Sequence, residues 1–269
     1  METIDIVQHN ILLSYTSKQQ FSQEQFWSEH TLSMLLSGEG RVYNNEETQR
    51  YTPGTIGLLK RNQLAKTVKI PSADGKPFKS VGIILDQETL RRYSAANGLT
   101  ATSPYTGKTM LKLNQNHFIS GFFDSLLPYF EQPGQLTKRL SELKTKEAIE
   151  LLLSHDPGLK ELLFDFSEPF KIDLETFMNS HFTYNVPIKQ FAKLTGRSMS
   201  TFKRDFKKAF HQTPERWLKD RRLDKAHFLI SELRQRPSEV YLQVGFENFS
   251  HFSASFKQRF GYNASTVGQ

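Results

Sequence analysis

Residues 198–211, Ser-Met-Ser-Thr-Phe-Lys-Arg-Asp-Phe-Lys-Lys-Ala-Phe-His, share a pattern with residues 248–261, Asn-Phe-Ser-His-Phe-Ser-Ala-Ser-Phe-Lys-Gln-Arg-Phe-Gly. Phenylalanines stand at positions 202, 206 and 210 of the first stretch and return fifty residues later. The same offset matches Pro187 with Pro237 and Leu194 with Val244. So many matches at one offset indicate two copies of one structural unit.

Each copy has the pattern of a helix-turn-helix. A proline suited to the first helical position precedes a short apolar helix, a turn that contains glycine, and a second helix. Ser198 and Asn248 each stand one residue before that second helix. Because their side-chain oxygens can accept from an otherwise unpaired backbone N–H, both are predicted to be N-caps.

The second helix of the first copy is predicted to be amphipathic. Phe202, Phe206 and Phe210 fall on one stripe, and aromatic residues at this spacing fill a core far more often than they stack on nucleotides. The opposite face holds the polar and basic residues Ser200, Thr201, Arg204, Lys207 and Lys208. By itself, such a face could equally be an ordinary solvated surface.

The distribution of charge favours a nucleic-acid partner. Residues 1–170 contain 18 Lys and Arg against 19 Asp and Glu, whereas residues 171–269 contain 17 against 9. The net charge of +7 therefore comes from the last hundred residues. This segregation is typical of a domain that displaces counterions from a phosphate backbone.

Residues 213–233 separate the two copies and begin with Thr213-Pro214. An N-cap followed by proline, with no later Gly or Pro, predicts one continuous helix. At ~1.5 Å per residue this helix would span roughly 30 Å, close to the ~34 Å between major-groove faces one turn apart on B-DNA. One chain could therefore place two recognition helices in successive grooves.

The stretch Gln243-Val-Gly-Phe-Glu-Asn-Phe-Ser-His-Phe-Ser-Ala-Ser-Phe-Lys-Gln-Arg-Phe-Gly261, preceded by Arg221-Arg222-Leu223 and Ala226, resembles the signature of AraC-type bacterial transcription regulators. The resemblance covers about residues 171–266. It implies a DNA-binding domain at 171–269 with seven helices, two helix-turn-helix units and a long joining helix. It also implies double-stranded promoter DNA and RNA polymerase as partners, and usually activation of transcription.

The resemblance places specific residues against DNA. Carried across by position, the residues offered to bases are Ser200, Thr201, Lys203 and Arg204 on the first recognition helix and Ser250, His251, Ser253 and Ala254 on the second. Arg204 is the main candidate for base recognition, because a guanidinium can pair bidentately with guanine. Lys207, Lys208 and Lys257 are predicted to hold phosphates, as are Ser198 and Asn248 through the helix N-termini. Lys203 could do either.

The first half has the pattern of a β domain. Short apolar or alternating runs at 31–36, 55–59 and 79–85 are punctuated by Ser37-Gly38-Glu39-Gly40 and Pro53-Gly54, which predicts strands and turns. Their order resembles the cupin-like barrel at the N-terminus of many AraC-type regulators. The predicted fold is therefore α+β with two domains: a cupin-like barrel with trailing helices at 1–165, and an all-α DNA-binding domain.

Enzymatic cupins need a His-x-His and Glu cluster for a metal, and here His30 stands without such neighbours. We therefore predict no metal, no cofactor and no catalytic residue, and interpret the barrel as a regulatory pocket or an interaction surface. Candidate pocket residues are Trp27, His30, Met34, Tyr43 and Arg61, although each is more often core or surface than ligand contact. The effector is left open as a small molecule or a regulatory protein, because the arrangement resembles the AraC-type activators of type III secretion, which answer to protein partners.

Residues 116–166 change to helical periodicity, with helices predicted at 118–130 and 136–153. Leu136, Leu140 and Leu143 form a stripe that either packs on its own barrel or, as the resemblance implies, forms a homodimer interface. The sequence supports these two interpretations of the stripe equally.

The chain-wide numbers agree with a cytoplasmic protein of two domains. The 269 residues leave room for two cores, the absence of cysteine excludes disulfides, and no apolar run reaches the ~18 residues of a membrane span. Two alternatives remain: a metal-free cupin-like enzyme fused to a DNA-binding domain, and a scaffold that binds nucleic acid without sequence preference.

Overall fold

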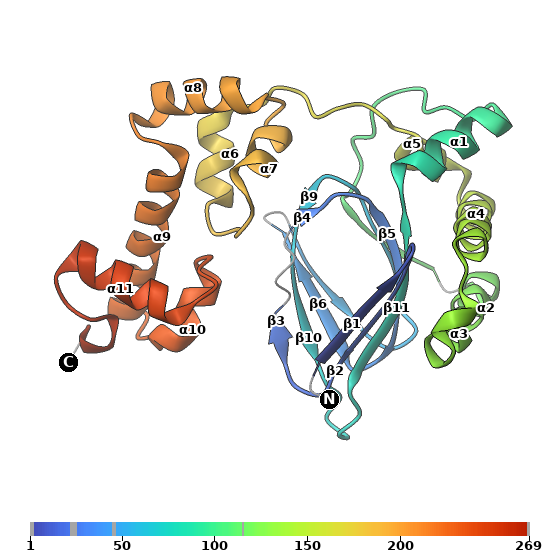
Figure 1. Ribbon diagram of the computed structural model, residues 1–269, viewed down its shortest axis with the longest axis horizontal. Coiled ribbons are helices and arrows are strands. Elements are labelled where there is room, and N and C mark those ends of the chain that lie inside the picture. Colours follow the sequence, from blue (N-terminus) through green and yellow to red (C-terminus); the bar gives the residue numbers. More distant parts are fainter. Residues whose placement is uncertain (1–2, 22–25, 45–46, 115, 268–269) are drawn as a thin grey trace. The chain divides into compact units, whose positions relative to one another are not determined.

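The computed structural model describes residues 3–21, 26–44, 47–114 and 116–267 (Figure 1). The chain divides into two compact units, Met1–Ser167 and Glu168–Gln269. We call them the N-terminal unit and the C-terminal unit. The first is rich in strands and the second is helical, which confirms the predicted α+β class with two domains.

The strands of the N-terminal unit form antiparallel sheets. They are β1 (Thr3–Gln8), β2 (Ile11–Thr16), β3 (Gln20–Phe21), β4 (Phe26–Trp27), β5 (His30–Ser37), β6 (Glu39–Tyr43), β7 (Thr48–Tyr51), β8 (Ile56–Leu59), β9 (Gln63–Leu64), β10 (Lys66–Ile70), β11 (Phe78–Leu85) and β12 (Met110–Leu113). The order is β1-β2-β11-β5-β8-β12 in a six-stranded sheet and β3-β10-β6-β7 in a four-stranded sheet, while β4 pairs with β9. The three strands predicted from the sequence are confirmed as β5, β8 and β11. In the described residues the hydrogen-bonded ladders leave these sheets separate.

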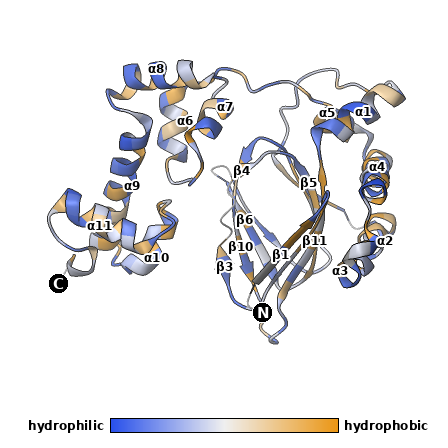
Figure 2. Cartoon of the chain, in the orientation of Figure 1, coloured by the Kyte–Doolittle hydropathy of each residue, from blue (hydrophilic) through white to orange (hydrophobic). Residues whose placement is uncertain are grey.

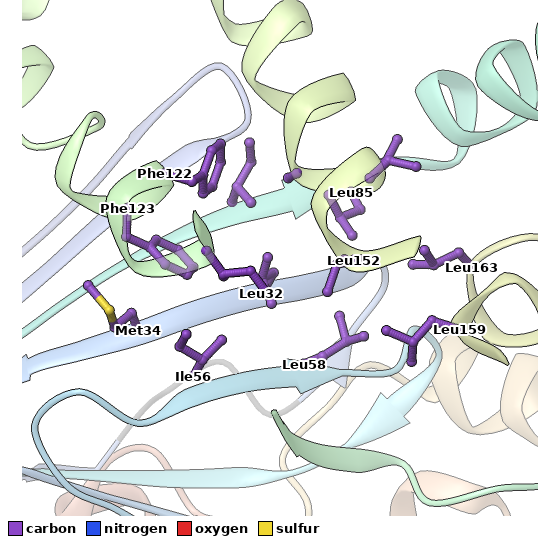
Figure 3. Close-up of a cluster of buried hydrophobic side chains, with 14 of the residues drawn as sticks. Leu32, Met34, Ile56, Leu58, Leu85, Phe122, Phe123, Leu152, Leu159 and Leu163 are labelled. Carbon is purple, nitrogen blue, oxygen red and sulfur yellow. The ribbon is translucent and has the colours of Figure 1, made fainter. Parts of the chain in front are cut away.

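The six-stranded sheet is covered by apolar side chains on one face. Alternate residues of its central strands, Leu32 and Met34 of β5 and Ile56 and Leu58 of β8, belong to the main buried cluster of this unit. Figure 3 shows them beside Phe123 and Leu152, which come from helices. Because side chains alternate across a strand, the residues between them face the other way.

Five α-helices are described in this unit: α1 (Gln87–Asn97), α2 (His117–Asp124), α3 (Pro128–Glu131), α4 (Lys138–His155) and α5 (Lys160–Leu163). The prediction of a single helix over 118–130 is wrong. The helix ends at Asp124, and Pro128 begins a separate short helix, because proline has no N–H and its ring collides with the carbonyl four residues earlier. Helix α1 was not predicted; Asp86 caps it, and Gly98 ends it in the left-handed conformation.

The described part of the C-terminal unit contains six α-helices, namely α6 (Leu174–His181), α7 (Ile188–Leu194), α8 (Met199–Phe210), α9 (Pro214–Ser231), α10 (Pro237–Gln243) and α11 (Phe249–Phe260). A short 3₁₀ helix, Ala264–Thr266, follows where the resemblance implied a seventh helix. The α7–α8 pair and the α10–α11 pair are the two predicted helix-turn-helix units. Pro237 is the first residue of its helix, whereas Pro187 lies one residue before its helix, at the N-cap.

Helix α9 is unbroken between the two pairs, as predicted. Thr213 accepts a hydrogen bond from the Arg216 N–H, and Pro214 occupies the first helical position. Trp217, which lies near the start of α9, packs on the phenylalanine stripe of α8, with ring centroids 5.6 Å from Phe206 and 4.5 Å from Phe210. Near the other end, His227 stacks on the corresponding stripe of α11. The same helix therefore contributes a ring to each of the two cores.

Candidate nucleic-acid interface

The first turn of α8 carries a cluster of hydroxyl groups. Ser198 Oγ accepts a hydrogen bond from the Thr201 N–H at 3.3 Å, which confirms the predicted N-cap. The same oxygen lies 3.1 Å from Ser200 Oγ and donates to Thr201 Oγ1 at 3.0 Å. Ser198 and Ser200 are exposed and Thr201 is half-buried. A helix N-terminus with hydroxyl groups around it can hold a phosphate through both backbone and side-chain donors.

The cations of α8 point away from its core. Lys203, Arg204, Lys207 and Lys208 are all exposed, whereas Phe202 and Phe206 on the other face are fully buried. The Arg204 side chain is 75% exposed, so its guanidinium can reach a partner outside the protein. Figure 2 shows the mixture of hydrophilic and hydrophobic residues along this helix.

Asp205 balances part of this charge at the inner edge of α8. Its carboxylate accepts from Arg197 Nε at 3.1 Å and lies 3.3 Å from Arg204 Nη2 and 3.5 Å from Lys171 Nζ. The hydrogen bond from Arg197 and the nearby cations lower the pKa of Asp205. The carboxylate therefore stays ionised at neutral pH and orients Arg197, a residue that sequence analysis did not select. The long exposed stem of Arg204 leaves it able to turn from this contact to a base edge.

Helix α11 presents a different surface. Asn248 Oδ1 accepts from the Ser250 N–H at 2.8 Å and from the His251 N–H at 3.1 Å, which confirms the second predicted N-cap. Ser250, His251 and Lys257 are exposed, and Ser253 is half-buried. Ala254 adds no polar group to this face. Hydroxyl, imidazole and one ammonium group therefore face outward here, and no guanidinium stands at the position that Arg204 has in α8.

Arg259, near the end of α11, binds within the protein. Its guanidinium lies 2.8 Å from Asp220 Oδ1 and 2.7 Å from Asp224 Oδ1, both on α9. These ion pairs attach the second recognition helix to the long helix.

The two recognition helices lie at opposite ends of α9 (Figure 1). The structure thus brings the predicted DNA-facing residues together in two patches, one at each recognition helix.

The N-terminal unit contains a partly open cavity of about 480 Å³. Its walls include Thr31, Ser33 and Leu35 of the six-stranded sheet and Val42 and Thr67 of the four-stranded sheet. The two sheets therefore face one another across the cavity. The residues of β5 that line it alternate with those that pack on the helices.

One of the five predicted pocket residues, Trp27, lines this cavity, and the other four are not among the lining residues. Met34 lies on the helix-packed face of β5, in the buried cluster. Tyr43 lies half-buried at the end of β6. Thr31 and Ser33 are among the residues that take their place. They alternate with Leu32 and Met34 along β5, but alternation alone does not show which face of a strand lines a cavity.

His30 and Arg61 belong to a hydrogen-bonded cluster that joins β5 to residues 165–167. The backbone N–H of Arg61 donates to His30 Nδ1 at 3.3 Å, and the Arg61 guanidinium donates to the carbonyls of Asp165 and Ser167 at 2.9 Å and 2.8 Å. Burial, together with the positive charge of Arg61, lowers the pKa of His30 to about 3, so its imidazole is neutral at physiological pH. These residues fasten the end of the N-terminal unit to its sheets.

The leucine stripe after the sheets is divided. Leu136 is buried and Leu140 is half-buried, and both pack with the core of their own unit. Leu143 is 53% exposed. Leu136 and Leu140 therefore fit the interpretation that the stripe packs on its own domain. Leu143 remains available for a contact with another molecule.

Comparisons with known proteins agree with this architecture. A family model described as the ExsA N-terminal regulatory domain matches residues 30–164, half of the chain, and a helix-turn-helix domain model matches residues 191–269. The chain belongs to the AraC-type transcription regulators with an ExsA-type N-terminal domain. It is thus a DNA-binding transcription regulator, and the relatives that support this assignment are regulators, not enzymes.

The curated relatives match along most of their length. The virulence regulon transcriptional activator VirF of Yersinia enterocolitica is 24% identical over 245 residues, which cover 88% of each chain. The HTH-type transcriptional regulator ExsA of Pseudomonas aeruginosa is 24% identical over 251 residues, 90% of this chain and 86% of the relative. A crystal structure of an apo ToxT variant from Vibrio cholerae covers 94% of this chain and 95% of its own, with a TM-score of 0.48 and 13% identity. Among the described residues, every helix is too short or too polar to span a lipid bilayer.

Proposed function

We propose that this regulator activates transcription from promoters in which α8 and α11 contact successive major grooves, with α8 supplying most of the base recognition. The observation that carries the proposal is the exposed, capped and polar face of each recognition helix, set at the two ends of one unbroken helix. The net charge of +8 in residues 171–269 supports phosphate binding along the same surface. Activation is proposed because the relatives with most of the chain in common include proteins named as activators.

Selection of duplexes from a random pool tests the DNA-binding part. The full-length protein should recover one site with two boxes, and its affinity for this site should exceed that for random duplexes by about 10³ or more. A flat ratio would favour the scaffold that binds nucleic acid without sequence preference. The selected site placed before a reporter gene then tests activation, and RNA polymerase added to the protein–DNA complex should give a larger ternary complex. Repression of the reporter would overturn the activating role.

We propose further that the cavity of the N-terminal unit binds a small-molecule effector. Within the described residues, four that line it each have a buried polar atom without a hydrogen-bond partner inside the protein: Ser14 Oγ, Gln20 Oε1, Trp27 Nε1 and Thr67 Oγ1. A buried polar atom without a partner costs free energy, so a ligand that supplies one stabilises the unit. Lys69 of β10, which is buried, pairs with the half-exposed Asp5 of β1 at 2.7 Å, so a charged pair that joins the two sheets also lines the cavity.

The change Ser14→Leu tests the cavity, because it adds volume where the ligand would lie and removes one hydroxyl. Reporter output should then become insensitive to the growth condition that controls the unmodified protein. The same change on the exposed surface, Ser103→Leu, is the matched control and should leave the response intact. If both variants respond normally, control through a regulatory protein bound to the outer surface replaces the small-molecule proposal.

A homodimer through the helices after the sheets completes the proposal. Leu143 on α4 and Phe118 on α2 are 53% and 77% exposed, which supports an apolar contact with a second copy. In sedimentation equilibrium, Leu143→Glu should shift the protein toward monomer, whereas Lys146→Glu on the same helix should not. An unchanged association constant for Leu143→Glu would contradict this interface.

A further inference from the structure

Arg222 lies in the middle of α9 and binds three backbone carbonyls that belong to both halves of the C-terminal unit. Its Nε donates to Phe182 O at 2.7 Å and its Nη2 donates to Tyr184 O at 2.7 Å, both in the loop between α6 and α7. Its Nη1 donates to Gly245 O at 3.0 Å, in the turn between α10 and α11. One planar guanidinium therefore connects the loop beside the first helix-turn-helix with the turn of the second.

The two segments also touch each other directly. Gly245 has a φ of +93°, and a Cβ atom there would lie 2.7 Å from Thr183 O and 3.0 Å from Arg222 Nε. Only glycine allows the turn to approach the loop this closely. Asn185 of the loop donates a hydrogen bond to Glu247 of the turn. We call this contact region the joint; its residues are Phe182, Thr183, Tyr184, Asn185, Arg222, Gly245 and Glu247.

The joint lies where a small rotation would move both recognition helices. Helices α6 and α7 both pack against α8. The loop between α6 and α7 therefore moves together with α8. The turn that contains Gly245 leads directly into α11. Helix α9 alone fixes the separation of the two pairs along its own axis, but the rotation of each pair about that axis depends on side-chain contacts.

The chemistry of Arg222 suits this role. Burial lowers its pKa to about 10, partly offset by Glu247, so the guanidinium remains charged at neutral pH. A cation that is removed from water without a buried carboxylate against it must have its donors satisfied by dipoles, and the three carbonyls do this. Lysine could not replace it fully, because its single ammonium lacks the planar fork that reaches three acceptors.

On the basis of the proposed function, we propose that Arg222 is a positioning residue that fixes the orientation of α11 relative to α8 and thereby sets the separation of operator boxes that the protein accepts. Arg222 makes this selection without contacting DNA. Specificity for spacing is then distinct from specificity for base sequence, which the exposed faces of the two recognition helices supply.

The first test measures the geometry without DNA. Since the chain contains no cysteine, Lys208→Cys and Lys257→Cys place one spin label on α8 and one on α11 at exposed positions. Double electron–electron resonance should give one narrow distance distribution in the otherwise unchanged protein. Arg222→Met should at least double its width, Arg222→Lys should give an intermediate width, and Lys225→Met should leave it unchanged. Lys225→Met is the matched control, because this substitution removes one charge from an exposed position on the same helix.

The second test uses the site recovered by selection, with the separation of its two boxes changed by one base pair in each direction. The unmodified protein should lose at least about tenfold in affinity at either altered separation, a loss typical of one disrupted group of base contacts. Arg222→Met should reduce this loss to less than about threefold, with affinity for a single isolated box unchanged. If the unmodified protein shows no preferred site, the proposed function fails, while the resonance experiment still decides the role of the joint.

Two outcomes would overturn the inference. One is a distance distribution for Arg222→Met as narrow as that of the unmodified protein. The other is a uniform loss of affinity with the spacing dependence intact, which would mean that Arg222 contributes stability alone. If Arg222→Met is unfolded at the assay temperature, both tests use Asn185→Ala, because this substitution removes a peripheral hydrogen bond of the joint. A distance distribution as narrow as that of the unmodified protein, together with an unchanged spacing dependence, would then refute the proposal.

Discussion

The two helix-turn-helix units have the same core but different outer faces. In both, two fully buried phenylalanines lie one turn apart, and the second of them packs against a ring from α9. Outside, α8 carries four basic residues and one acidic residue, whereas α11 carries two basic residues, one of which is bound to α9 through Asp220 and Asp224. The core positions preserve the repeat and the surface positions do not, because packing constrains only the buried face.

This difference supports a division of roles between the units. The first has long cations free to reach phosphates and guanine, and the second has short polar groups that make fewer demands on sequence. The second unit is instead attached to α9 by the ion pairs of Arg259 with Asp220 and Asp224. We therefore expect α8 to determine most of the base preference and α11 to determine where the second contact falls.

The largest expected effect is on the free energy of unfolding, and it tests whether the cores of the two helix-turn-helix units are packed alike. Phe206→Ala and Phe256→Ala should each lower the free energy of unfolding by about 3–5 kcal/mol, because each side chain is fully buried and its loss leaves a cavity. Urea unfolding measures the change, and Phe228→Ala, at a position 46% exposed, is the control with a smaller loss. A much smaller effect at one of the two buried positions would show that the units are not packed alike.

The next effect tests the division of roles in DNA binding. Arg204→Ala should weaken binding to the selected site by about 1–3 kcal/mol and broaden the base preference of its box. Ser253→Ala should change the preference less, since a half-buried hydroxyl makes at most a weak base contact. Lys208→Ala is the control for phosphate binding and should reduce the slope of log affinity against log salt by about 0.9. Equal broadening by Arg204→Ala and Ser253→Ala in a repeated selection would refute the division of roles.

A smaller effect distinguishes the two N-caps. Asn248→Ala should cost about 1 kcal/mol, and Ser198→Ala somewhat less, because Asn248 accepts from two backbone N–H groups and Ser198 from one, at the longer distance of 3.3 Å. Thermal unfolding of the two variants gives the comparison. A greater loss for Ser198→Ala would mean that the hydroxyl cluster of α8 stabilises its helix beyond the single cap bond.

The smallest effect concerns the helix ends. His211 has a φ of +55° after α8, and Gly261 has a φ of +85° at the equivalent place after α11. His211→Gly should stabilise the protein by about 0.5–1 kcal/mol, since glycine adopts the left-handed region without a steric penalty. Gly261→Ala should destabilise it by a similar amount, through the backbone alone, because nothing lies within 4 Å of an added Cβ. Changes of the same sign in the two variants would contradict this account.

Much of the C-terminal unit could be predicted because its signals are local. The caps at Ser198, Asn248 and Thr213 and the spacing of the phenylalanines act within a few residues of one another, and the structure confirms the helices that they predict. Of the two helices predicted after the sheets, one is divided at Pro128, a local signal that the periodicity concealed.

The N-terminal unit was less predictable where both faces of a strand are covered. In β5, Leu32 and Met34 pack on helices while Thr31 and Ser33 line the cavity, yet all four are buried or nearly so. The alternation of polar with apolar residues separates the two faces of this strand, but it does not show that one of them lines a cavity. Leu136 similarly has the spacing of an interface residue and is buried in its own unit.

The amino-acid sequence alone determined the repeated units, the helix that separates them and the residues exposed on each recognition helix, because these follow from periodicity and capping along neighbouring positions. The tertiary structure decided which face of β5 lines the cavity and why Arg222 differs from the other arginines of α9. Phe182, Tyr184 and Gly245 are 40, 38 and 23 residues away from Arg222 in the chain, so their carbonyls meet its guanidinium only after the helices have packed.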